Sequence, residues 1–259
     1  MNIGIIGTGN IASYLLEQIN HKQLASGRVT AIFGRNQEVG QRLSEDFEAD
    51  FYTDLKSFLN LPLDIVVEAA TVEAAGIYVK DVVASKKDLV VSSIGVFKNV
   101  AFLEELTALA ESKGTQIFLP SGAIGGLDVL QSAKAAGGLD RVQITTRKSP
   151  ASLGIEADEE RVIFNGSAFE AVGKFPKNVN VALVLAIAGI GVEKTKVRII
   201  VDPEIEQNTH MIEAEGDFGR MQLQVENNPM PGNPKTSLLA ALSILSVLQN
   251  KDRALRIGN

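Results

Sequence analysis

The chain has 259 residues, of which 45% are hydrophobic, and a formal net charge of -6. This composition is ordinary for a packed globular protein, and the length accommodates two small domains. The negative charge and the lack of any block of Lys or Arg argue against a nucleic-acid partner, and the absence of cysteine excludes disulfides, thiolate nucleophiles and Cys-based zinc sites. With only two histidines, no metal site is expected.

The apolar residues near the N-terminus, 3–6, predict a strand and lack the basic segment and apolar core of a signal peptide. The longest apolar stretch, 181–192, is shorter than the ~20 residues that a membrane span needs. We therefore expect a cytoplasmic protein with no membrane partner.

The first 120 residues alternate apolar strands with amphipathic helices. Strands are predicted at 3–6, 29–33, 65–68, 89–92 and 116–119, and helices at 11–21, 39–46, 74–85 and 101–113. The less regular segment 50–61 is expected to hold a short helix. Near-continuous apolar strands separated by helices are typical of a parallel sheet covered on both faces, and right-handed crossovers make it doubly wound.

The pattern changes after Pro120, where a glycine-rich turn at 121–126 precedes a helix at 127–136. Strands are then predicted at 142–147, 161–164, 196–201, 210–214 and 221–225, with a helix opened by a Ser167/Glu170 capping box, an apolar, buried helix at 180–188 and a final amphipathic helix at 237–249. Period-two alternation with few crossovers predicts an α+β domain on a mostly antiparallel open sheet. The expected division is 1–120 for dinucleotide binding, 121–232 for substrate binding and dimerisation, and 233–259 for a C-terminal helix that packs back on the first domain.

The most informative motif is Gly7-Thr8-Gly9-Asn10-Ile11-Ala12, between the first strand and the first helix. Gly7 permits a tight turn, Gly9 lets the backbone approach a pyrophosphate, and Ala12 allows close packing of helix and strand. Free N–H groups at the helix N-terminus favour the phosphates. The motif therefore predicts a nicotinamide dinucleotide on a Rossmann-type doubly wound sheet.

The second strand ends in Gly34-Arg35-Asn36. A cofactor with a free ribose 2′-hydroxyl usually meets Asp or Glu at this position, whereas this chain offers glycine and then arginine.

His210 is the side chain best suited to proton transfer near neutral pH. The residues alone leave open the alternative of a surface or hydrogen-bonded core histidine. Asn178 and Asn180 are candidates for an amide that binds the nicotinamide or its ribose, against the alternative that Asn180 caps the buried helix. Arg147, Lys148 and Lys235 are candidates to hold substrate carboxylates, against the common alternative of solvated surface cations.

Several blocks, in order along nearly the whole chain, resemble the L-aspartate dehydrogenase family. They are Gly7-Thr8-Gly9-Asn10-Ile11-Ala12, Leu119-Pro120-Ser121-Gly122-Ala123-Ile124-Gly125-Gly126, Gly166-Ser167-Ala168, Phe175-Pro176-Lys177-Asn178-Val179-Asn180-Val181-Ala182, Asp202-Pro203, Asn208-Thr209-His210, Gly216-Asp217-Phe218-Gly219, Asn228-Pro229 and Asn233-Pro234-Lys235-Thr236-Ser237. The resemblance implies reversible oxidative deamination of L-aspartate to oxaloacetate and ammonia through iminoaspartate, which in some organisms feeds NAD biosynthesis. It also implies a homodimer, a catalytic role for His210, and cofactor contacts near the nicotinamide for Ala123 and Asn180.

The chain departs from many family members at the end of the second strand, where they carry an acidic residue. Loss of the acid removes repulsion of a 2′-phosphate, and Arg35 can pair with that phosphate. We therefore expect NADP to be preferred, with NAD possible. The expected cofactor-binding residues are Gly7, Thr8, Gly9, Asn10, Ile11, Gly34, Arg35, Asn36, Ala70, Thr71, Ala123 and Asn180, and the expected substrate-binding residues are Asn208, Lys148 and Lys235.

Two alternatives remain open on the sequence. One is another two-domain NAD(P)-dependent dehydrogenase, similar to homoserine dehydrogenase or dihydrodipicolinate reductase. The other is a catalytically silent NADP-binding sensor, which would bind the dinucleotide without turning over an amino or keto acid.

Overall fold

The computed structural model describes residues 1–175, 180–255 and 257, except for the side chains of Pro234 and Lys235. The chain forms two compact units. Unit 1 comprises Met1–Pro120 and Ile244–Ala254, and unit 2 comprises Ser121–Ser243 and the end of the chain from Leu255.

Unit 1 is built on a six-stranded parallel sheet with the order β3-β2-β1-β4-β5-β6. Its strands are β1 (Asn2–Ile6), β2 (Arg28–Phe33), β3 (Asp50–Tyr52), β4 (Ile65–Glu68), β5 (Asp88–Val91) and β6 (Ile117–Phe118). This order is that of a doubly wound dinucleotide-binding sheet, whose ligand crevice lies where β1 meets β4. The predicted Rossmann-type domain is confirmed.

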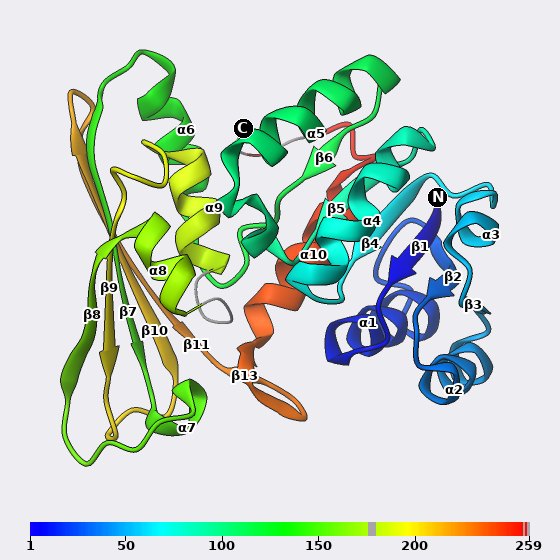
Figure 1. Cartoon of the computed structure of the whole chain (residues 1–259), viewed down its shortest axis with the longest axis horizontal. Helices are drawn as coiled ribbons and strands as arrows, with labels where there is room; N and C mark the ends of the chain where they lie inside the picture. The colour runs from blue at the N-terminus through cyan, green and yellow to red at the C-terminus, as the bar shows by residue number, and fades with distance from the viewer. Residues whose placement is uncertain (176–179, 256, 258–259) are drawn as a thin grey trace. The chain divides into compact units, whose positions relative to one another are not determined.

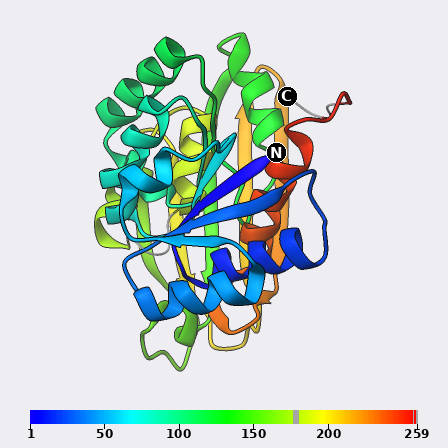
Figure 2. The ribbon, with the colours of Figure 1, turned by 90° about the vertical axis from the view of Figure 1, so that its right-hand side faces the viewer.

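Helices cover both faces of this sheet, with α1 and α2 on one side and α4 and α5 on the other (Figures 1 and 2). Their bounds are α1 (Asn10–Leu16), which continues as a π-helical turn (Glu17–His21), α2 (Gln37–Phe47), α3 (Leu55–Leu59), α4 (Val72–Ala84), a 3-10 turn (Ile94–Lys98) and α5 (Val100–Lys113). Segment 50–61 contains the expected short helix, α3. It also contains β3, which the sequence reading missed.

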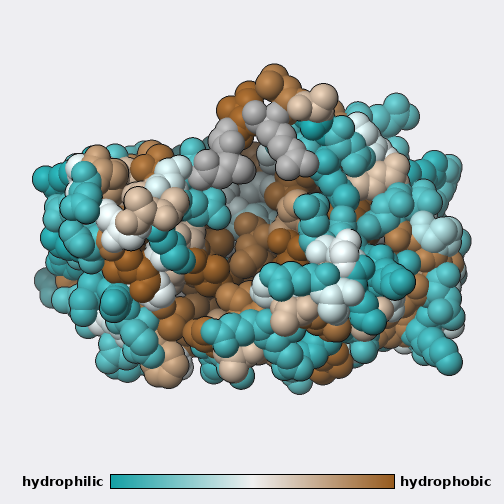
Figure 3. Space-filling model, turned by 90° about the horizontal axis from the view of Figure 1, so that it is seen from above, coloured by the Kyte–Doolittle hydropathy of each residue, from teal (hydrophilic) through white to brown (hydrophobic). Residues whose placement is uncertain are grey.

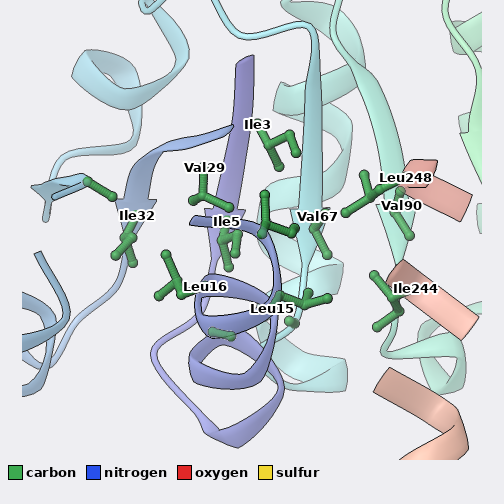
Figure 4. Close-up of a cluster of buried hydrophobic side chains, with 14 of the residues drawn as sticks. Ile3, Ile5, Leu15, Leu16, Val29, Ile32, Val67, Val90, Ile244 and Leu248 are labelled. Atoms are coloured by element: carbon green, nitrogen blue, oxygen red, sulfur yellow. The ribbon is translucent and has the colours of Figure 1, made fainter. Parts of the chain in front are cut away.

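A continuous apolar core lies between the sheet of unit 1 and α1 (Figure 4). Ile3 and Ile5 of β1 are buried against Leu15 and Leu16 of α1. The C-terminal half of α10 (Leu238–Asn250) contributes Ile244, Leu245 and Leu248 to the same cluster. Burial of a Leu or Ile side chain contributes roughly 1.5–3 kcal/mol, so these contacts fix α1 and its N-terminus on the sheet.

Unit 2 is built on a five-stranded sheet with the order β11-β10-β7-β9-β8. Its strands are β7 (Leu139–Lys148), β8 (Arg161–Ser167), β9 (Lys196–Val201), β10 (Asn208–Gly216) and β11 (Gly219–Asn227), and a separate hairpin pairs β12 (Pro229–Met230) with β13 (Asn233–Ser237). All neighbouring strands of the sheet are antiparallel except β7 and β9, which run parallel. The mostly antiparallel α+β domain expected from the sequence is therefore confirmed.

Helices α6 (Leu127–Ala135), α8 (Ala168–Lys174) and α9 (Asn180–Ala188) lie on one face of this sheet, and α7 (Pro150–Leu153) lies at one end (Figure 1). The predicted capping box of α8 is present, and α9 is buried almost all round. Along β10, Asn208, His210, Ile212 and Ala214 are buried, whereas the alternate residues are half-buried. We call the buried side of the sheet, under the helices, its inner face.

The view in Figure 3 shows hydrophilic side chains over much of the surface, with apolar residues exposed in patches. Among the described residues, no helix has the length and apolar character needed to cross a membrane.

Candidate functional site

The glycine turn after β1 has the geometry that a phosphate site requires. Gly7 adopts φ of +124°, and an added Cβ would lie 2.5 Å from the Ala69 carbonyl oxygen, so only glycine fits. Gly9 is the N-cap of α1, and a Cβ there would meet no atom within 4 Å. The first turn of α1 carries no acidic residue. The N–H groups of Asn10 and Ile11 have no partner within the helix at this position, so the turn fits a dinucleotide pyrophosphate.

The turn after β2 lies beside the glycine turn. A Cβ added to Gly34 would lie 2.7 Å from Cγ2 of Thr8, so glycine allows the two turns to pack together. Arg35 is exposed and forms no ion pair within the part of the chain that the structure describes. Its guanidinium is therefore available to a ligand at this edge of the sheet.

Asn36 and Thr71, two of the expected cofactor residues, each cap a helix. The Asn36 side chain accepts a hydrogen bond from the Val39 N–H and caps α2. The Thr71 side chain accepts one from the Ala74 N–H and caps α4. Capping places the start of each helix at the carboxyl edge of the sheet, where Ala70 also lies.

Glu68, at the end of β4, is a functional candidate that the sequence reading missed. Its fully buried carboxylate accepts hydrogen bonds from the N–H of Ala70 and from both the N–H and the hydroxyl of Ser93, each at 2.9 Å. Burial raises the pKa of Glu68, and the N–H donors oppose that rise. The side chain thereby joins the turns that follow β4 and β5. An acid that ends an apolar strand, Ile65–Glu68, was the available signal.

In unit 2, His210 lies on the inner face of the sheet with an exposed fraction of 1%. It pairs across the strands with Thr146 of β7, and the Thr146 hydroxyl lies 2.9 Å from the ring Nδ1. This bond fixes the plane of the ring and assigns Nδ1 to Thr146, so Nε2 is the nitrogen left for chemistry. Burial, reinforced by the positive charge of Lys148, lowers the pKa of His210 to about 3, and the imidazole is neutral at pH 7.

Lys148 lies on the same inner face, two residues beyond Thr146, and is 6% exposed. Burial lowers its pKa to about 8. A buried ammonium beside a neutral imidazole favours anions, and this makes Lys148 the candidate that suits a substrate carboxylate.

Arg147 does not suit that role. It belongs to the opposite face of β7 from Lys148, and its guanidinium is hydrogen-bonded to the carboxylates of Glu160 and Asp202. These two acids raise the pKa of Arg147. Of the two neighbouring candidates on β7, Lys148 is therefore better suited than Arg147 to hold a substrate carboxylate.

Two asparagines complete the inner face at this end of the sheet. Asn208 of β10 and Asn227 of β11 are both buried and form a register pair. The Asn227 amide nitrogen donates a hydrogen bond of 3.0 Å to the Ala123 carbonyl, 104 residues away along the chain. The adjacent Gly122 N–H donates to Oγ of Ser243 at 3.1 Å. The glycine-rich turn at 121–126 is therefore fixed at two points, one of them beside the His210 strand.

The predicted residues thus form two groups. The first, at the carboxyl edge of the unit 1 sheet, contains Gly7, Thr8, Gly9, Asn10, Ile11, Gly34, Arg35, Asn36, Ala70 and Thr71. The second, on unit 2, contains Lys148, Asn208 and His210 on the inner face, with Ala123 joined to that face through Asn227. Asn180 is the first residue of α9, while Asn178 and the side chain of Lys235 lie outside the described residues. Within the described residues no group of three His, Cys, Asp or Glu side chains could hold a metal ion.

Comparison with known proteins gives matches to both halves of the chain. Residues 128–251 match the family model described as aspartate dehydrogenase, C-terminal, and residues 7–120 match the NAD-binding domain of homoserine dehydrogenase. The chain is 36% identical to an L-aspartate dehydrogenase of Methanococcus maripaludis and 37% identical to one of Methanospirillum hungatei, with at least 99% of each chain covered. This chain belongs to the aspartate dehydrogenase family.

Solved structures agree with that assignment. The aspartate dehydrogenase of Thermotoga maritima is 30% identical, with a TM-score of 0.81 over 100% of this chain and 99% of the other. A hyperthermophilic archaeal homoserine dehydrogenase in complex with NADPH shares the fold alone, at 16% identity, with a TM-score of 0.62 over 98% of this chain and 99% of the other. The resemblance to the L-aspartate dehydrogenase family inferred from the sequence motifs is therefore confirmed, and with it a nicotinamide cofactor.

Proposed function

We propose that this protein catalyses the reversible NAD(P)-dependent oxidative deamination of L-aspartate to oxaloacetate and ammonia through iminoaspartate. The observation that carries the proposal is the arrangement on the unit 2 inner face, where Thr146 orients a buried, neutral His210 near the buried Lys148. The printed names of full-length relatives support the same substrate.

Binding of the substrate uses its two carboxylates. Lys148 attracts one of them, and the low exposure of the lysine strengthens that attraction because little water competes. Asn208 offers a second polar group on the same face. When bound, the nicotinamide supplies the hydride acceptor for the substrate Cα.

His210 then handles the proton. It accepts a proton from water as the water oxygen bonds to the imine carbon, which gives the carbinolamine, and it returns that proton to the nitrogen. The C–N bond then breaks with its electrons going to nitrogen, while the hydroxyl loses its proton to the departing ammonia and the C=O bond of oxaloacetate forms. In the free protein the pKa of His210, about 3, is too low for this task. The negative charges of the dicarboxylate raise that pKa, and neutralisation of Lys148 by a carboxylate removes the repulsion that lowers it. Proton transfer of this kind accelerates reactions about 10²–10⁴-fold.

For the cofactor, the proposal is that NADP is preferred and NAD is also used. Gly34 removes the acid that would repel a 2′-phosphate, and Arg35 provides an exposed guanidinium beside the glycine turn. Ala123 and Asn180 are proposed to contact the nicotinamide end of the cofactor. The protein is further proposed to act in the cytoplasm as a homodimer. Light scattering on the purified chain tests the dimer.

The experiment is a spectrophotometric assay with oxaloacetate, ammonium and either NADPH or NADH, with ammonium omitted as the control. The proposal expects cofactor oxidation only when oxaloacetate and ammonium are both present, and a higher kcat/KM for NADPH. Equal values or a preference for NADH would refute the cofactor choice. Turnover with homoserine but not aspartate would refute the substrate.

A further inference from the structure

Asn227, at the end of β11, has a side chain whose orientation the surrounding backbone determines. Its Nδ2 lies 3.0 Å from the Ala123 carbonyl oxygen and 3.5 Å from the Asn208 carbonyl oxygen. Both of these groups only accept hydrogen bonds, so the amide nitrogen must face them and the amide oxygen must point the other way. The usual ambiguity between the two ends of an asparagine amide does not arise here.

The amide oxygen of Asn227 is buried, and no donor within the described residues reaches it. The side chain as a whole is only 2% exposed. It is the single side-chain nitrogen or oxygen in that part of the chain with both properties. A buried acceptor without a donor costs about 1–3 kcal/mol, and native proteins satisfy such groups with few exceptions. The position of this one is therefore informative.

Asn227 shares the inner face with the proposed catalytic residue. His210 pairs with Val225, and Asn227 is the next residue on the same side of β11, diagonal to His210. Diagonal neighbours of this kind lie about 7–8 Å apart, a spacing that a four-carbon dicarboxylate can bridge. The substrate offers both kinds of hydrogen-bonding group: its carboxylates accept and suit Lys148, whereas its amino nitrogen donates and requires an acceptor.

We infer that Oδ1 of Asn227 accepts a hydrogen bond from the nitrogen of the substrate throughout the reaction. The donor is the amine of aspartate, the N–H of the imine, or the ammonia that leaves or enters. This inference rests on the proposed function. Asn227 holds the nitrogen while His210 transfers the proton, and its bond to Ala123 aligns the amide for that contact. In this role Asn227 recognises the nitrogen of the substrate, whereas Lys148 recognises a carboxylate.

The test compares Asn227→Ala with Ser243→Ala as the matched control. Ser243→Ala loosens the same turn through Gly122 without touching the acceptor. The readouts are the KM for ammonium at saturating oxaloacetate and NADPH, and the Kd for NADPH by fluorescence titration.

The inference expects Asn227→Ala to raise the KM for ammonium about tenfold, the effect of losing one hydrogen bond. It expects the Kd for NADPH to change less than twofold, and Ser243→Ala to keep the KM for ammonium within about threefold. If Asn227→Ala does not fold, Asn227→Gln, which displaces the acceptor by one methylene, carries the same expectation.

Three results would overturn the inference. The first is an equal loss of NADPH affinity, which would assign the acceptor to the cofactor. The second is the same rise in KM for Ser243→Ala, and the third is a loss of stability with an unchanged KM for ammonium. A failure of the proposed function looks different, because the unmodified protein itself would then show no turnover with oxaloacetate and ammonium.

Discussion

Replacement of Thr146 by valine removes the hydroxyl that lies 2.9 Å from Nδ1 of His210 and leaves the side-chain shape nearly unchanged. Both residues are buried, so no water replaces the lost partner. A buried group left without its hydrogen bond costs about 1–3 kcal/mol, which sets the expected fall in the free energy of unfolding. If the same energy orients the ring in the transition state, kcat falls about 5–150-fold, since 1.4 kcal/mol corresponds to a factor of ten.

The assay measures kcat and KM for oxaloacetate and ammonium, together with urea unfolding. Thr145→Val is the matched control, because Thr145 is the adjacent residue on the half-exposed face of β7. Thr146→Ser should keep most of the activity, because it retains the hydroxyl. If Thr146→Val loses stability but retains full kcat, Thr146 is a structural residue and does not orient His210.

Three further predictions concern the cofactor and the effect of pH. Arg35→Ala should lower kcat/KM for NADPH about tenfold, because an exposed hydrogen bond to a charged group is lost, and should leave kcat/KM for NADH within twofold. Arg42→Ala, on the exposed side of α2, is the control. An equal loss of kcat/KM with both cofactors would contradict the role of Arg35. Glu68→Gln should weaken NADPH binding about tenfold in a fluorescence titration, because an amide NH₂ then faces an N–H donor in the turns after β4 and β5. Ser93→Ala should weaken NADPH binding less. An unchanged NADPH affinity for Glu68→Gln would show that Glu68 does not support the cofactor site. The pKa of His210 is about 3 in the native protein and about 6.5 in the unfolded chain, so between these pH values only the unfolded chain binds the proton. The free energy of unfolding should therefore fall as the pH drops from about 6.5 to about 3. Urea unfolding of His210→Asn should show a smaller change over this pH range, and an identical change would count against a buried neutral His210.

The sequence predicted the parallel sheet of unit 1 well because its strands are buried on both faces and read as continuous apolar runs. It missed β3 because this strand has only three residues, begins with Asp50 and is half-exposed. In unit 2, β11 was predicted as 221–225 but extends over Gly219–Asn227, because polar residues on its exposed face hide its ends. The parallel pairing of β7 with β9 has no local signal, since it depends on contacts between residues more than fifty positions apart.

The candidate site could likewise be predicted only where a local sequence pattern indicates it. Alternation along β7 implies that Arg147 and Lys148 face opposite ways, but only the fold shows that the lysine is on the buried side. The pairing of Thr146 with His210 joins residues 64 positions apart, so no sequence pattern revealed it. Glu68 and Asn227 were missed for a related reason: a polar residue at the end of a strand looks like a surface residue until its burial is known.

The rate of NADPH oxidation by the unmodified protein and by His210→Ala, with oxaloacetate and ammonium as substrates, tests the catalytic role of His210. Turnover by the unmodified protein should require ammonium. The rate should be about 10²–10⁴-fold lower for His210→Ala, with the Kd for NADPH unchanged. Near-normal turnover by His210→Ala, or oxidation of NADPH without ammonium, would contradict the proposed reaction.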